Sequence, residues 1–137
     1  MLKRSVAVLV AFTFLFSTGC ISLRTAERYQ YEELEERLPA VGLDIERSKD
    51  PALAGVLNIL PGIGNAYLGQ WGLFAVNFLF WPLSVVWGIP QAAIDAGTIN
   101  KQDTVYYYSF GGGAKWLAKL EKEKQQEKGT ELAVEEK

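Results

Sequence analysis

The fold of this chain is decided by residues 51–94, which read PALAGVLNILPGIGNAYLGQWGLFAVNFLFWPLSVVWGIPQAAI. This stretch contains no Asp, Glu, Lys or Arg, although charged residues make up 22% of the whole chain. An uncharged run longer than about 18 residues is typical of a membrane segment, and twice ~20 residues suffices for two crossings. We therefore expect an all-α membrane protein built around a two-helix membrane hairpin, residues 51–100.

The charge-free stretch divides into two expected elements, residues 51–70 and 71–94. The second is the more apolar and the stronger candidate for a membrane span. Trp71 and Trp87 are spaced to mark its two interfaces, where amphipathic rings settle. Asn77 interrupts this half, and its amide needs a protein partner because lipid offers none. One face of the second element should therefore meet another helix.

A group of turn residues interrupts the first element. Proline and glycine close together break a helix and indicate an unwound turn. The residues assigned to this hairpin turn are Pro61, Gly62, Gly64, Asn65, Tyr67 and Gly69. Two arrangements follow from such a break. Either the first element is a broken span shielded by the second, or the pair is a re-entrant hairpin that does not cross fully.

The order of these residues resembles a known family. Pro61-Gly62-Ile63-Gly64-Asn65-Ala66-Tyr67-Leu68-Gly69-Gln70, followed by Trp87 and then Ile94-Asp95-Ala96, is similar to the two-transmembrane-helix domain family. The resemblance covers roughly residues 51–100. It implies a compact helical hairpin in the membrane, and it implies no particular activity because the family has no general assigned one.

The N-terminus has the pattern of a secretory leader. Lys3 and Arg4 precede an uncharged run that ends at Gly19, directly before the only cysteine of the chain, Cys20. A basic start, a short apolar run and small residues at a cleavage site characterise a signal peptide. The sequence Ser17-Thr18-Gly19-Cys20 also resembles the lipobox of bacterial lipoproteins.

The lipobox resemblance implies a processing route and a location. Residues 1–19 would be removed, and Cys20 would carry covalent diacylglycerol and acyl groups such as palmitate. The protein would then be lipid-anchored on the bacterial cell membrane. An even number of crossings would leave the polar segments, 20–50 and 101–137, outside the cytoplasm. Ser22 resembles the pattern that permits sorting to the outer membrane, which is the alternative location.

The segment from 20 to 50 is expected to be a lipidated polar arm with a connector. Apolar residues recur at helical spacing along it, so most of one face is apolar; this face carries Leu23, Glu27, Tyr31, Leu34 and Leu38. Pro39 should end this helix, and Pro51 suits the first turn of the next. The arm either packs on a partner or only spaces the anchor from the hairpin.

The segment from 101 to 137 is expected to hold an aromatic part and a charged tail. The Tyr106–Tyr108 cluster predicts either a short strand or an aromatic patch at a membrane or binding surface. Gly111–Gly113 predicts a hinge. Beyond it, an amphipathic turn around Trp116 leads into a flexible tail of alternating charge.

The residue inventory argues against an enzyme. The chain has no histidine, and its single cysteine is the expected acylation site. Histidine-dependent acid–base catalysis, cysteine nucleophiles and zinc sites therefore lack their side chains. Asp95, Asn100 and Asp103 offer oxygens, but their spacing does not match a calcium loop. We interpret them as part of a helix end capped near Gly97, and expect no metal and no catalytic residue.

The sequence predicts a non-enzymatic cell-envelope lipoprotein, a structural or assembly accessory. Its partners would be membrane lipid and either a membrane protein packed against the hairpin or a second copy of the chain. Nucleic acid is not an expected partner, because acidic residues outnumber basic ones. The alternative is a small oligomeric transport or permeability accessory whose path is lined by Asn58, Asn65, Asn77 and Ser84.

Overall fold

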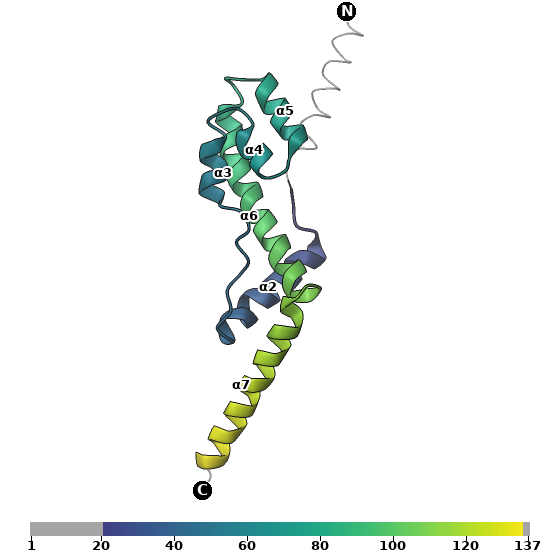
Figure 1. Ribbon diagram of the computed structural model, residues 1–137, viewed down its shortest axis with the longest axis vertical. Helices are drawn as coiled ribbons and strands as arrows, with labels where there is room; N and C mark the ends of the chain where they lie inside the picture. The colour runs from purple at the N-terminus through teal and green to yellow at the C-terminus, as the bar shows by residue number, and fades with distance from the viewer. Residues whose placement is uncertain (1–20, 136–137) are drawn as a thin grey trace, which may run out of the picture. The chain divides into compact units, whose positions relative to one another are not determined.

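A computed structural model describes residues 21–135, with side chains through Thr130, and the regular secondary structure of this part of the chain is all helical (Figure 1). The predicted leader and Cys20 lie outside the described residues. The helices are α2 (Thr25–Ala40), α3 (Pro51–Leu57), α4 (Ile63–Tyr67), α5 (Trp71–Leu79), α6 (Val85–Ser109) and α7 (Gly113–Glu135). The expectation of an all-α protein is therefore confirmed for these residues.

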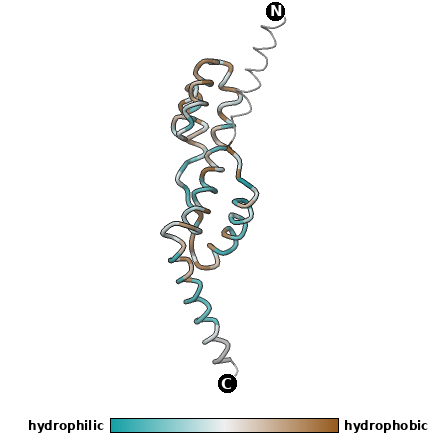
Figure 2. The backbone as a smooth tube through the Cα atoms, turned by 90° about the vertical axis from the view of Figure 1, so that its right-hand side faces the viewer, coloured by the Kyte–Doolittle hydropathy of each residue, from teal (hydrophilic) through white to brown (hydrophobic). Residues whose placement is uncertain are grey.

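The described residues form two compact units. Unit 1 comprises residues 21–22 and 49–99, and unit 2 comprises residues 23–48 and 100–135. Unit 1 thus contains α3, α4, α5 and the first part of α6. Figure 2 shows that the backbone of this unit is mostly coloured as hydrophobic, whereas much of α2 and α7 is hydrophilic.

Unit 1 begins with a well-defined helix start. The Asp50 side chain accepts the backbone N–H groups of Ala52 and Leu53 at 2.8 and 3.0 Å, which satisfies two amides that the first turn leaves free. Pro51 occupies the first helical position, as predicted, where its missing N–H costs nothing. The chain then turns at Gly62, whose φ of 80° favours glycine, and enters α4.

The second half of the charge-free stretch is not one helix. The sequence made residues 71–94 the stronger candidate for a span, but α5 ends at Leu79 and α6 begins only at Val85. Pro82 lies in the break, where its ring and missing N–H disfavour a continuing helix. The predicted interruption of the first half is confirmed, since α3 and α4 are separate helices. No helix in the described part of the chain combines the length and apolar character needed to cross a bilayer.

The expected helix end near Gly97 is also wrong. Helix α6 continues for 25 residues, from Val85 to Ser109, and includes the tyrosine cluster, which therefore forms neither a strand nor a loop. Nothing lies within 4 Å of the position a Cβ would take at Gly97, so this glycine is not required by packing. The helix stops instead before Gly111–Gly113, where the sequence predicted a hinge.

Unit 2 has its own apolar core. The predicted apolar face of the arm is confirmed, because Tyr31, Leu34 and Leu38 of α2 are buried. They pack with Leu43, with Val105 and Tyr108 of α6, and with Leu117 of α7. The arm therefore packs within its own chain. Helix α2 keeps Pro39 in its last turn, one residue from its end.

The predicted flexible tail is helical as far as Glu135. Two contacts hold the start of α7: Leu117 is buried in the unit 2 core, and Glu121 accepts two hydrogen bonds from Arg37 at 2.8 and 3.0 Å. The alternating charges assist the helix locally, as in the Lys119–Glu123 pair four residues apart. The composition suggested a solvated tail because it could not reveal that α2 offers this packing surface.

Candidate functional site

The interior of unit 1 holds a cluster of polar side chains beside a small apolar core of Ala54, Leu68, Ala92 and Ala96. Its buried polar side chains are 0 or 1% exposed and come from different elements: Asn58, Asn65, Asn77, Ser84 and Asp95. Asn58 directly follows α3, Asn65 lies in α4, Asn77 in α5 and Asp95 in α6. An uncompensated buried amide is costly, so these groups have to find partners inside the unit.

Asn65 is the centre of this arrangement. Its Oδ1 accepts hydrogen bonds from Nδ2 of Asn58 at 2.9 Å and from Nδ2 of Asn77 at 2.7 Å. Asn58 Nδ2 also donates to the carbonyl of Gly88 at 2.5 Å, and Asn58 Oδ1 accepts the Gly64 N–H at 3.0 Å. Asn65, in the shortest helix of the unit, thereby joins α5 to the residue that follows α3, and Asn58 extends the connection to α6.

The hydrogen bonds continue from Asn65 to a carboxyl group. Asn65 Nδ2 donates to Oε1 of Gln70 at 2.8 Å, and Gln70 Nε2 donates to Oδ2 of Asp95 at 2.9 Å. The other oxygen of Asp95 accepts the backbone N–H of Ile21 at 3.2 Å. We call Asn58, Asn65, Asn77, Gln70 and Asp95 together the amide relay.

Burial raises the pKa of the Asp95 carboxyl above its ordinary value. Hydrogen bonds from Gln70, Ile21 and Gln91 act in the opposite direction, because they favour the charged form, but burial is the larger effect. The relay therefore ends at a carboxyl whose charged form is favoured by its donors and disfavoured by its surroundings.

The orientation of every amide in the relay is forced by its two ends. At one end the Gly64 N–H and the Trp87 indole N–H can only donate, and they donate to Asn58 and to Asn77. At the other end an ionised Asp95 can only accept. Turning any single amide around would place donor against donor. Within the described residues, no buried side-chain nitrogen or oxygen lacks a partner.

Two glycines make room for the relay. A Cβ at Gly64 would lie 2.1 Å from the carbonyl oxygen of Ala54, and a Cβ at Gly88 would lie 2.8 Å from Asn58 Nδ2. Real Cβ atoms do not approach a backbone oxygen so closely, so any side chain at Gly64 must displace α3 or α4. The glycines of this stretch therefore permit close packing between helices, as in membrane helix interfaces.

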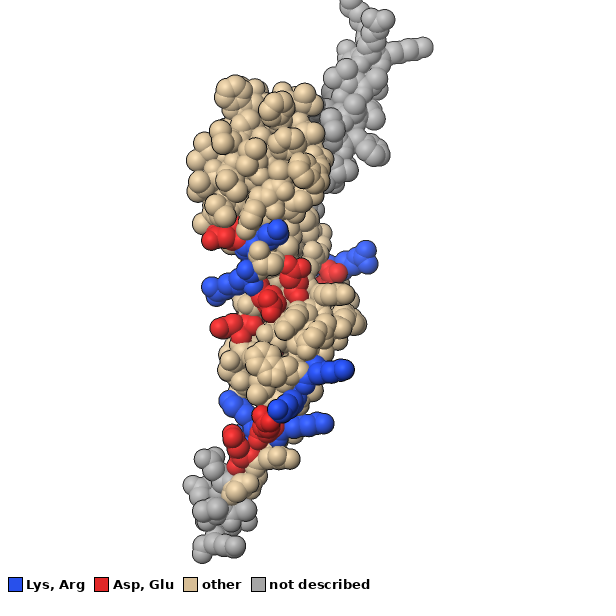
Figure 3. Space-filling model, viewed as in Figure 1, with Lys and Arg blue, Asp and Glu red and all other residues tan. Residues whose placement is uncertain are grey.

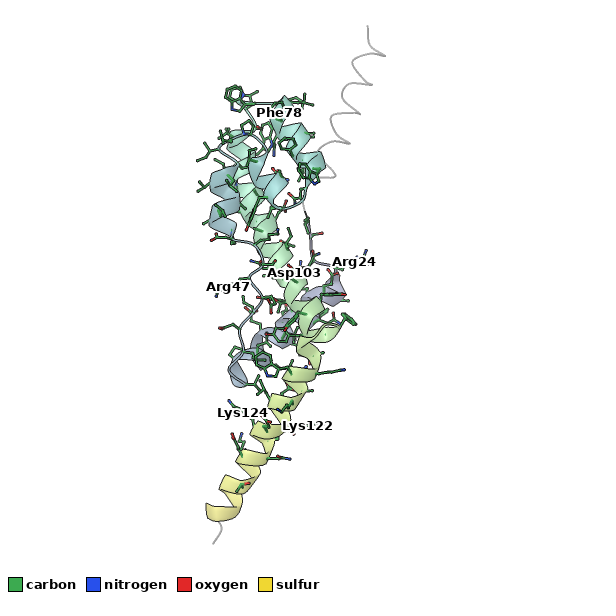
Figure 4. All side chains as sticks on the ribbon, in the orientation of Figure 1. Arg24, Arg47, Phe78, Asp103, Lys122 and Lys124 are labelled. Carbon is green, nitrogen blue, oxygen red and sulfur yellow. The ribbon has the colours of Figure 1, made fainter. Side chains whose placement is uncertain are left out.

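The outside of unit 1 is apolar. Figure 3 shows a face over α3, α4 and α5 without any Lys, Arg, Asp or Glu. We define the outer apolar surface as the exposed large side chains of this unit: Leu53, Val56, Ile59, Leu60, Ile63, Trp71, Phe78, Leu79, Phe80, Trp81, Leu83, Val86 and Ile94. Phe78, labelled in Figure 4, is 63% exposed. Unit 1 thus exposes its large apolar side chains and buries a hydrogen-bonded polar network beside a small apolar core.

The hairpin-turn residues named from the sequence have different roles. Gly62, Gly64 and Asn65 are buried, and Asn65 is central to the relay. Pro61 and Tyr67 are half-buried, and Gly69 is exposed with a φ of 80°. The Tyr67 hydroxyl accepts the Asp50 N–H at 3.1 Å, and its carbonyl accepts a bond from Lys49. The predicted helix partners of Asn77 are found in α4 and α6.

Sequence reasoning missed Gln70 and Asp95 as members of the same network. The sequence places Asp95 with Asn100 and Asp103, but the structure separates their partners: in unit 2 the Ser48 hydroxyl donates to Asp103, and its oxygen lies 3.4 Å from Asn100 Oδ1. Residues 21–135 contain no group of three acidic, histidine or cysteine side chains placed to hold a metal ion. The sequence does contain one signal for this network: amide side chains recur through an otherwise apolar stretch, and buried amides are expected to hydrogen-bond to one another.

The groups of the relay are suited to a structural role. The four amide side chains of the relay do not ionise, and their hydrogen bonds hold the helices of unit 1 in place; Asp95 is its one ionisable member. A comparison of the chain with protein-family models, curated proteins and solved structures found no match.

Proposed function

We propose that this chain is a non-enzymatic bacterial envelope lipoprotein, acylated on Cys20, whose unit 1 inserts its outer apolar surface into the membrane and packs against a partner membrane protein. In this role it is a structural or assembly accessory, and both polar segments lie outside the cytoplasm. The single observation that carries the proposal is the outer apolar surface of unit 1, which encloses a fully hydrogen-bonded polar network.

The physical argument begins with the outer apolar surface. Monomeric soluble proteins rarely expose large contiguous apolar patches, and those that do use them for protein or membrane contacts. Here thirteen large apolar side chains are exposed on a unit whose residues 51–94 carry no charge. Contact with lipid or with an apolar protein surface removes this area from water, which is favourable.

The interior supports the same environment. In hydrocarbon no water is present to satisfy polar groups, so a membrane-inserted unit has to pair them internally. The amide relay does this, and no described buried polar side-chain atom is left without a partner. The alternative of a permeability path gains no support here, because Asn58, Asn65, Asn77 and Ser84 are buried and bonded within the unit.

Acylation is tested by labelling the protein with a palmitate analogue in bacterial cells. Wild type should be labelled and recovered with the membrane fraction, while Cys20→Ala should carry no label and retain residues 1–19. A wild-type protein without lipid mass, soluble without detergent, would remove the basis of the proposal.

Partner contact is tested with a photo-crosslinking residue placed at Phe78 on the outer apolar surface. A matched residue at Lys122, on the exposed face of α7, serves as the control; both positions are labelled in Figure 4. Crosslinks to a membrane protein or to a second copy are expected at position 78 only. Recovery of monomer alone, at both positions and after purification in mild detergent, would contradict the packing role.

A further inference from the structure

We infer that Asp95 holds the lipid anchor against unit 1, by accepting the backbone N–H of the first residue after the acylated cysteine. This inference rests on the proposed function, and it adds how the anchor is positioned. The observation behind it is the hydrogen bond from Ile21 N–H to Asp95 Oδ1 at 3.2 Å, which joins residues 74 positions apart.

Covalent chemistry places this contact next to the lipid. The nitrogen of Ile21 is bonded to the carbonyl carbon of Cys20, so it stays an amide N–H after the leader is removed. Consecutive Cα atoms are about 3.8 Å apart, so the acylated residue begins one residue length from Ile21. A contact at this position leaves the anchor almost no free linker.

The acceptor is built into the unit and is not an incidental surface group. Asp95 is fully buried, and its second oxygen is occupied by Gln70 at 2.9 Å. Gln70 is in turn fixed by Asn65 at 2.8 Å, so the relay sets the position of the carboxyl. Ile21 itself is half-buried. The N-terminal segment therefore docks on the end of a network that spans unit 1.

This contact would give the lipid anchor a second role besides attachment, which is to orient unit 1 at the membrane surface. An inserted unit with a large apolar surface already has affinity for the membrane, so acyl chains add little if they only retain it there. Acyl chains held next to Asp95 instead fix which part of unit 1 lies at the lipid surface. Asp95 is thus a positioning residue for the anchor.

The experiment measures the mobility of the segment between the anchor and α2. Ser22→Cys is labelled with a nitroxide, which reacts only there because acylation blocks the Cys20 thiol, and the protein is placed in lipid nanodiscs. Electron paramagnetic resonance spectra are compared for this background and for three further variants made in it. Asp95→Ala removes the acceptor, and Ile21→Pro removes the donor. Thr98→Ala is the matched control, since its exposed hydroxyl bonds only to Ile94 of its own helix.

Slow label motion is expected in the background and in Thr98→Ala, with a correlation time at least about twofold shorter in Asp95→Ala and Ile21→Pro. Equal mobility in all four proteins, with helix content retained, would overturn the inference. If Asp95→Ala loses helix content, Ile21→Pro decides, because it leaves the relay intact.

The intact mass of each sample separates the two proposals. Lipid mass with unchanged mobility overturns only the docking, whereas absence of lipid mass overturns the proposed function and the docking together.

Discussion

Asn77 Nδ2 donates to Asn65 Oδ1 at 2.7 Å, and this bond joins α5 to α4 inside a unit whose outside is apolar. The same oxygen accepts a hydrogen bond from Asn58 Nδ2, so two asparagines from different parts of the charge-free stretch donate to one oxygen of a third. The arrangement explains how a chain with such an apolar surface reaches a defined structure. Apolar packing is weakly directional, whereas a fully satisfied polar network specifies one alignment of its helices.

The first prediction concerns the centre of the relay. Asn65→Ala removes three hydrogen bonds: Asn77 Nδ2 and Gln70 Oε1 lose the partner described above, and Asn58 Nδ2 keeps only the Gly88 carbonyl. The free energy of unfolding should fall by about 3 kcal/mol or more, since each unsatisfied buried group costs about 1–3 kcal/mol. Urea unfolding in mild detergent, followed by circular dichroism, measures it. Thr98→Ala should change it by less than about 0.5 kcal/mol, and equal effects of the two variants would refute a central role for Asn65.

The second prediction compares two glycines of unit 1. Gly64→Ala places a Cβ against the Ala54 carbonyl at 2.1 Å and should cost at least about 3 kcal/mol or prevent folding. Gly97→Ala lies within α6 with nothing inside 4 Å, and should stabilise by about 0.5–1 kcal/mol through helix propensity. Thermal melting in detergent separates them. Two changes of the same sign would contradict the described packing.

The third prediction concerns pH. Because burial raises the pKa of Asp95, the folded protein binds this proton more tightly than the unfolded chain. As pH rises from about 4, the usual carboxyl value, the unfolded chain loses the proton first. The contribution of Asp95 to stability is therefore complete at low pH and is lost as pH rises through the raised pKa.

The stability of Asp95→Asn should not fall with pH in this way, although its amide nitrogen faces the donor of either Gln70 or Ile21 and lowers stability overall. The measurement is the difference in unfolding free energy between wild type and variant across pH 3–8 in mild detergent. A difference that does not vary with pH would show that Asp95 titrates alike in both states.

The fourth prediction tests whether α7 belongs to unit 2. Leu117 is 3% exposed and Trp116 is 49% exposed, although they are neighbours in sequence. Leu117→Ala should cost about 2–4 kcal/mol by leaving a cavity in the core. Trp116→Ala removes a larger side chain but should cost less, because half of it is already in solvent. Hydrogen exchange along α2 and α7 reports the loss of stability locally. A greater loss of protection in Trp116→Ala than in Leu117→Ala would contradict the described packing of α7.

An ion pair at the same place contributes less. Arg37 donates from two nitrogens to Glu121 and also to Glu33 at 2.8 Å, which raises the pKa of its guanidinium. The Arg37 side chain is 42% exposed, so water screens these charges. Such pairs contribute about 0–1 kcal/mol. Leu38 and Leu117, rather than this pair, therefore hold α2 and α7 together.

The sequence by itself determined several features of this protein. Helical periodicity in the arm identified Tyr31, Leu34 and Leu38 as a buried face, Pro51 marked a helix start, and the absence of charge over residues 51–94 indicated an apolar element. A break in its first half was also predicted, but the structure places it at residues 58–62, and Ile63–Tyr67 of the predicted turn is helical. These outcomes depend on local backbone preferences and on spacing along one helix, and a sequence records both directly.

Only the tertiary structure decided which distant side chains meet. Asp95 looked like a polar residue at a helix end, and instead it closes a network that begins at Asn58 and receives Ile21. The tail looked solvated, and instead Leu117 completes a core with α2. In each case the deciding partner is many residues away, and hydrogen bonding and apolar burial depend on distance in space, which the order of residues along the chain does not specify.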